Sequence, residues 1–148
     1  MGFRYSLQKI VDLKGSEKSM AEWEYAASLG KLRKEEEKLA LLREERDGLE
    51  RQIQDASDKP TPLRELLATQ RYMEVVDERI RRQNEGVRTA EGHVRDRQGR
   101  LTVKMVDEKV WLNARERAWD RFRKERLAIE QNELDEIAIV RAASAGRR

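Results

Sequence analysis

The sequence contains no cysteine and a single histidine, His93. Without cysteine the chain cannot form a disulfide, a thiolate nucleophile or a cysteine zinc site. One histidine cannot build a histidine metal cluster, and we expect His93 to be exposed or to flank a helix seam. We expect neither a metal nor another cofactor.

Apolar residues are also scarce: 38% of the 148 residues are hydrophobic, 5% are aromatic and 41% are charged. A compact domain of this length needs roughly 45–50% apolar residues. The composition instead favours long helices that bury a narrow apolar stripe. The sequence has no glycine-rich phosphate loop, nucleophile elbow or paired-histidine signature. We therefore expect that the protein is not an enzyme.

A strong charge of one sign is absent as well. The chain has 32 basic and 29 acidic residues, which are interleaved and leave a net charge of +3. Interleaved charges are typical of a solvated helix face rather than of a nucleic-acid patch. No apolar run approaches the ~18 residues of a membrane span, and the first residues lack the apolar stretch of a signal peptide. We expect a cytoplasmic protein without direct membrane insertion or a nucleic-acid partner.

Proline occurs only as Pro60 and Pro62. A helix cannot pass through both, because proline lacks the amide hydrogen and crowds the preceding turn. We predict that Thr61 caps the following helix, with Pro62 at its first position. The prolines divide the chain, 1–148, into the parts of a single coiled-coil domain: a helix over about residues 3–56, a turn at 57–62, a helix over about 63–143 and a frayed tail at 144–148.

The second predicted helix carries an apolar residue at every seventh position: Leu66, Met73, Ile80, Val87, Val94 and Leu101. A strict seven-residue repeat keeps one stripe facing a partner helix and implies a left-handed coiled coil. Farther along, the apolar positions shift by four residues: Met105, Leu112, Trp119, Phe122 and Ile129. Such a shift predicts a stutter, which is a local unwinding of the supercoil.

The first predicted helix has a comparable seam: Tyr25, Leu29, Leu32, Leu39, Leu42, Leu49, Ile53 and Ala56. Glu36 and Arg46 interrupt this seam, and the step from 39 to 42 is expected to break strict heptad phase. Because the connection has only about six residues, the helices must run antiparallel. We predict an all-α fold, an elongated antiparallel two-helix coiled-coil hairpin.

The two predicted helices differ in length. Pairing outward from the turn uses up the first helix near residue 116, so the rest of the second helix overhangs. Trp119 and Phe122 lie there within the arginine-rich stretch 115–126, and tryptophan and arginine are favoured anchors at protein interfaces. These aromatic rings either bind a partner or pack within the chain. The candidates for internal packing lie near the N-terminus: Phe3, Tyr5 and Leu7.

Two further features leave alternatives open. Tyr72 and Val75 are surplus to the seam, so they either contact a partner or widen the seam. Three glycines in the second helix, Gly86, Gly92 and Gly99, either bend the helix or are tolerated within it at a cost of about 1 kcal/mol each.

Several segments resemble the FliJ family of flagellar type III export proteins. The opening FRYSLQKIVDLK (3–14) is similar to the start of that family. The other matching segments follow in the family's order: AEWEYAAS (21–28), the proline turn, QRYMEVVDERI (70–80) and LDEIAI (134–139). The resemblance covers nearly the whole chain.

This resemblance implies a hairpin similar to the γ-subunit stalk of rotary ATPases. It implies three kinds of partner: the hexameric export ATPase FliI, the export gate protein FlhA and the export chaperones. It also implies a cytoplasmic location, peripheral to the inner face of the cell membrane. The paired ends of the helices would face the ATPase, which marks six residues: Leu7, Ile10, Trp119, Phe122, Asp135 and Glu136.

The family's gate-binding stripe falls near the start of the second helix, on Tyr72, Val76, Arg79 and Gln83. Tyr72 and Val76 keep the bulky apolar type of the family. Arg79 and Gln83 depart from it, since small and histidine residues are expected there.

Two alternative functions follow from the residues alone. The basic stretch 115–126 permits a nucleic-acid-binding hairpin, whose affinity would fall steeply with salt. A generic scaffold would pair its helices between chains, whereas the hairpin predicts a monomer.

Overall fold

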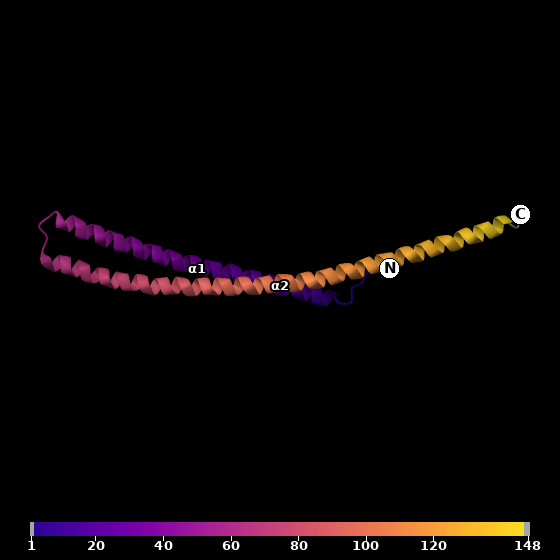
Figure 1. The fold of residues 1–148 in the computed structure, drawn as a ribbon, viewed down its shortest axis with the longest axis horizontal. Helices are drawn as coiled ribbons and strands as arrows, with labels where there is room; N and C mark the ends of the chain where they lie inside the picture. The colour runs from indigo at the N-terminus through magenta and orange to yellow at the C-terminus, as the bar shows by residue number, and fades with distance from the viewer. Residues whose placement is uncertain (1, 147–148) are drawn as a thin grey trace. The chain divides into compact units, whose positions relative to one another are not determined.

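The computed structural model describes residues 2–146 and contains two helices, α1 (Gln8–Ser57) and α2 (Leu63–Gly146), with no strand among those residues. This architecture confirms the all-α two-helix hairpin predicted from the sequence. Both prolines lie in the short turn between α1 and α2, which can be followed in Figure 1.

The Thr61 side chain closes the turn from the side of α1. Its hydroxyl group shares its single proton between the carbonyls of Ala56 and Lys59, which both lie at 3.2 Å. The last turn of a helix leaves such carbonyls without a helical partner. The prediction that Thr61 caps the second helix, with Pro62 at its first position, is wrong because α2 begins at Leu63, directly after Pro62. The carbonyl of Pro62 accepts an early amide bond of α2 instead, from Glu65 at 3.1 Å.

The helix α1 begins at Gln8 rather than near residue 3. The amide of Gln8 donates to the carbonyl of Tyr5 at 3.1 Å, so the chain turns just before the helix starts. The reason is packing, because the ring of Phe3 leaves the helical path and lies against Trp119, with 5.2 Å between ring centroids.

Packing divides the chain into two compact units, which we call the turn unit (Met20–Thr102) and the end unit (Met1–Ser19 with Val103–Arg148). Each unit contains a segment of α1 and a segment of α2. Within the end unit α2 continues to Gly146, inside the tail predicted at 144–148. The last two residues of that predicted tail lie outside the described residues.

The core of the turn unit is a single seam between its two helical segments. Val76 is completely buried, with 0% of its surface exposed. The other buried residues of this unit are small or aliphatic: Ala21, Ser28, Leu39, Val87 and Ala90. The heptad positions predicted from Leu66 to Leu101 are all buried or half-buried, which confirms the repeat on this part of α2.

On α1 the seam follows heptad phase more strictly than residue type. Ser28 is buried, whereas the predicted seam residue Leu29 is exposed. The polar interruption falls on half-buried Glu35 and not on exposed Glu36. The step from 39 to 42 joins a buried and a half-buried residue, because steps of three and four alternate in a heptad. The predicted break of phase at this step is therefore wrong.

Polar contacts across the seam fix the antiparallel register of the turn unit. They join residues near the end of α1 to residues near the start of α2: Glu45 with Tyr72, Arg46 with Asp77, and Glu35 with Gln83. Glu45 and Arg46 contact Tyr72 and Asp77, whereas Glu35, nearer the N-terminus of α1, contacts Gln83, which lies farther from the turn along α2. Figure 1 shows the two helices of this unit side by side.

The helix α2 continues through Gly86, Gly92 and Gly99 without interruption. A Cβ atom at Gly86 would lie 3.2 Å from the carboxylate of Glu35, so α1 approaches closely there. A Cβ atom at either of the other two would meet nothing within 4 Å. Packing therefore explains the glycine at position 86 and gives no reason for the other two.

The end unit contradicts the predicted stutter. Met105 is 51% exposed and Leu112 is also exposed, whereas Lys104, Glu108 and Trp111 are half-buried. The inward positions of α2 thus keep the seven-residue spacing, although two of them carry charged side chains. These charges can occupy a seam because residues of α1 pair with them.

Candidate functional site

An aromatic cluster holds the N-terminal segment against α2 in the end unit. The ring centroid of Phe3 lies 5.2 Å from that of Trp119 and 5.4 Å from that of Phe122. The guanidinium of Arg115 lies 5.9 Å from the centroid of Phe3 and donates to Gln8 at 2.7 Å. The interpretation that the Trp119 and Phe122 rings pack within the chain is therefore confirmed, with Phe3 as the residue on which they pack. Trp119 still exposes part of its surface, so it also remains open to a partner.

Beyond Phe122, α2 continues as a single helix, which we call the free segment (residues 123–146). Every residue of the free segment is exposed, and in Figure 1 no other helix lies beside it. It carries apolar side chains that no part of the described chain covers: Leu127, Ile129, Leu134, Ile137, Ile139 and Val140. An overhang was predicted from residue 116, and it starts later because Phe3 extends the paired region.

The six residues implied to face the ATPase fall into two groups. Leu7 lies directly before α1 and Ile10 lies in its first turn, in the same unit as the Trp119 and Phe122 rings. Two acidic residues, Asp135 and Glu136, lie in the free segment instead, about three and a half helical turns beyond the aromatic cluster. The two groups are therefore separate places on the end unit.

Charged residues of the end unit form a seam that sequence reasoning missed. Lys14 Nζ lies 2.9 Å from Asp107, and Lys18 Nζ lies 2.8 Å from Glu108. Glu17 accepts from Lys104 at 3.1 Å. The hydrogen bond to Asp107 raises the pKa of Lys14 above its usual value. The available signal was the seven-residue spacing itself, which places charged residues at inward positions of both helices.

The four residues of the implied gate-binding stripe do not share one face of the turn unit. Tyr72 is 40% exposed and Arg79 is exposed, but Val76 is completely buried in the seam. Gln83 points inward, because its amide donates to the carbonyl and the carboxylate of Glu35 at 2.8 and 2.6 Å. The outward residues are therefore Tyr72 and Arg79.

Val75 adds an apolar side chain to this outward face, since it is 46% exposed. Steps of three and four residues place Tyr72, Val75 and Arg79 on one side of α2. The Tyr72 hydroxyl donates to Glu45, and this hydrogen bond raises the pKa of the phenol. Val75 is therefore an outward residue, whereas Tyr72 lies at the edge of the seam, where it is 40% exposed and also bonds to α1. We call these three residues the outward triad.

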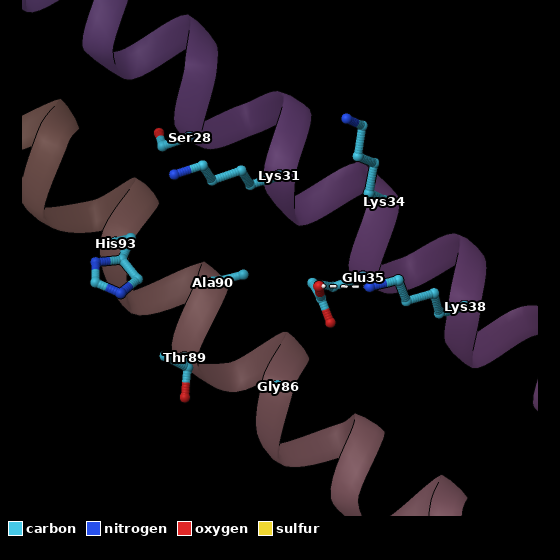
Figure 2. Close-up of a pocket in the computed structure, with 9 residues that line it drawn as sticks. All are labelled: Ser28, Lys31, Lys34, Glu35, Lys38, Gly86, Thr89, Ala90 and His93. Carbon is cyan, nitrogen blue, oxygen red and sulfur yellow. Dashed lines mark hydrogen bonds and ion pairs between the residues drawn. The ribbon is translucent and has the colours of Figure 1, made fainter.

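A shallow cleft of about 400 Å³ lies between the helices of the turn unit, where small residues such as Ser28, Gly86 and Ala90 line it. In Figure 2, the Lys31 side chain lies in the space between the helices, while Lys34 projects away from α2. Glu35 is paired with Lys38 at 3.3 Å. The cations around this cleft do not converge on one point, so the cleft lacks the geometry of an anion site.

Glu35 makes the turn unit sensitive to acid. Its hydrogen bonds with Gln83 and Lys38 hold the pKa of the carboxylate below its usual value of 4.5. The ionised form therefore stabilises the fold above pH 4.5, and this contribution is lost as the pH falls through the lowered pKa.

We expect the free energy of unfolding, measured with urea, to fall less between pH 7 and pH 3 in Glu35→Gln than in the wild type. The amide can still bond to Gln83 but does not titrate. The matched control is Glu36→Gln, an exposed neighbour, which should keep the acid sensitivity of the wild type. Equal losses in Glu35→Gln and wild type would contradict this assignment.

Two classes of site are not found in residues 2–146. No group of three or more histidine, cysteine, aspartate or glutamate residues in this range could hold a metal ion. No helix in this range is long and apolar enough to cross a membrane.

Three comparisons identify similar proteins. A family model described as "Flagellar FliJ protein" matches residues 3–147. The flagellar FliJ protein of Bacillus subtilis (strain 168) is 25% identical over 139 residues, which are 94% of this chain and 95% of the relative. The solved structure of a YscO homologue from Chlamydia trachomatis has the same fold, with a TM-score of 0.68, 23% identity and 99% of each chain covered.

Proposed function

Because the chain belongs to the FliJ family of flagellar type III export proteins, we propose that it is the non-catalytic stalk of the export ATPase ring. The stalk couples the FliI hexamer to the export gate protein FlhA. It acts at the cytoplasmic face of the cell membrane with the export apparatus, and it also contacts export chaperones.

The observation that carries this proposal is the free segment of α2. A lone helix in water is poorly stabilised by its own hydrogen bonds, and most helical stability in proteins comes from packing. The free segment nevertheless carries Leu134 and Ile137 on one side, with Val140 one turn farther on, and all three are exposed. A ring that surrounds this helix would cover these side chains.

The aromatic cluster supports the same proposal. Phe3, Trp119 and Phe122 hold the start of the chain to α2 immediately before the free segment begins. The ATPase ring would therefore contact first the aromatic cluster, where the N-terminal segment packs on α2, and then the single helix of the free segment. Asp135 and Glu136, in the free segment, are then ATPase-facing residues, while Leu7 and Ile10 support the base.

The gate contact belongs to the other unit. We assign it to the outward triad, Tyr72, Val75 and Arg79, because these side chains are accessible in the closed hairpin. Val76 and Gln83 act indirectly, since packing and the bonds to Glu35 hold this part of α2 in register. A partner that contacts the free segment and one that contacts the outward triad would thus bind different units of the chain.

The experiment that tests the proposal is a pair of binding assays with purified FliI hexamer and the cytoplasmic domain of FlhA. We expect Tyr72→Ala with Arg79→Ala to bind FlhA about tenfold more weakly, as is usual when an aromatic and an arginine anchor are removed. Binding to FliI should stay at the wild-type level, because the triad lies outside the end unit.

The matched control is Leu41→Ala, an exposed apolar residue on α1 of the same unit. It should bind both partners as the wild type does. A double variant that binds FlhA normally would contradict the gate assignment, and one that loses both partners would contradict the separation of the two surfaces.

A further inference from the structure

One short stretch of the end unit has its polarity reversed. Between residues 103 and 112, three charged residues of α2, Lys104, Asp107 and Glu108, pair with α1, while three valines point away. Val103, Val106 and Val110 are 64%, 59% and 56% exposed. Their spacing of three and four residues places them on one line along the helix. We call these three valines the outer stripe.

Ion pairs hold this reversed orientation. Asp107 and Glu108 are bound by Lys14 and Lys18 at 2.9 and 2.8 Å, and Lys104 is bound by Glu17 at 3.1 Å. Turning the valines toward α1 would break all three ion pairs and leave each charged group without its partner. The helix therefore cannot bury the outer stripe against its own partner, and the stripe remains available to another molecule.

The charges beside the outer stripe indicate the chemistry of that molecule. The two acidic residues of the stretch, Asp107 and Glu108, are occupied by the lysines of α1. Lys109 lies one turn from Val106, and Arg117 lies two turns beyond Val110 on the same line; both are exposed. Two acidic residues of α2 also border the outer stripe: Glu116, which is exposed, and Asp107, whose side chain is 37% exposed but is bound by Lys14. The border of the outer stripe is therefore mainly basic.

We infer that the outer stripe docks an amphipathic helix whose apolar stripe is flanked by acidic residues. Apolar positions at heptad spacing would cover the valines, and acidic flanking residues would meet Lys109 and Arg117, as in pairs of helices matched by charge. A second copy of this chain fits less well, because its own stripe has the same basic border and like charges would oppose each other. The inference does not depend on the proposed stalk function.

The test uses the full chain and two synthetic amphipathic helical peptides. Both peptides carry leucine at the a and d positions of three heptads, and they differ only in glutamate or lysine at e and g. Fluorescence anisotropy should show that the glutamate peptide binds about tenfold more tightly than the lysine peptide. Val106→Gln with Val110→Gln should weaken glutamate-peptide binding by about tenfold, because two half-exposed valines lose their burial.

A matched double variant, Leu127→Gln with Ile129→Gln, changes equally exposed residues of the free segment. It should bind the glutamate peptide as the wild type does, and circular dichroism should show equal helix content in all three proteins. Equal binding of the two peptides, or no loss in the valine variant, would overturn the inference. Self-association of the wild type that the valine variant abolishes would also overturn it, because a second copy would then be the occupant.

Discussion

Replacing Val76 by aspartate should unfold the turn unit, which is the largest stability effect expected for a single change in this protein. Val76 is completely buried in the seam of the turn unit. An uncompensated charge at such a position costs roughly 3–5 kcal/mol, and a small domain has only about 5–15 kcal/mol in total. Thermal unfolding followed by circular dichroism should show the change.

The neighbouring residue provides the matched control. Val75→Asp introduces the same side chain at a position that is 46% exposed, so its stability should change by less than about 1 kcal/mol. Equal destabilisation by the two changes would mean that the seam does not run through Val76. The comparison also separates folding from gate binding, because Val75 belongs to the outward triad.

The second large effect concerns the free segment. We expect Leu134→Ala with Ile137→Ala to reduce stimulation of FliI ATP hydrolysis to roughly a tenth of the wild-type level, since a few central side chains usually dominate an interface. Alanine favours helix, so the change removes apolar surface without breaking the helix. Both residues are exposed, and the melting temperature should therefore stay nearly constant.

Leu63→Ala with Leu67→Ala is the control for this second prediction. These two leucines are also exposed, but they lie next to the turn at the start of α2. They should leave ATPase stimulation unchanged. If the turn variant lost stimulation and the free-segment variant kept it, the stalk would have to enter the ring by its other end.

The fold could be predicted from the sequence because its main determinants are simple. Pro60 and Pro62 allow only one break, and the repeat from Leu66 to Leu101 has a residue of the expected type at every step. Periodicity is a strong signal when spacing and residue type agree. The paired helices of the turn unit follow directly from this agreement.

The seam could not be predicted where spacing and residue type disagree. Residue type favours Leu29 over Ser28 and Met105 over Lys104 as inward residues, whereas the helices follow the heptad phase. Phase prevails because a shift at one position would move every later contact along two long helices. The compensating partners, Lys14 and Lys18, lie roughly ninety residues away in sequence, so their ion pairs could not be read locally.

The candidate sites were predictable in part. Unequal helices predicted an overhang with aromatic residues at its base, and Phe3 moved its start beyond Phe122. The gate stripe, however, mixed two outward residues with two inward ones, because a resemblance fixes positions without fixing which way each side chain faces. Val76 and Gln83 illustrate this, since both point into the seam.

Site-specific photo-crosslinking tests most directly whether the unpaired end of α2 is the element that engages the motor. A photoreactive amino acid is placed at position 137 or at position 75 in the full chain, which is then irradiated with the FliI hexamer. The account predicts crosslinks to FliI from position 137 and none from position 75. Crosslinks from position 75 with none from position 137 would contradict it.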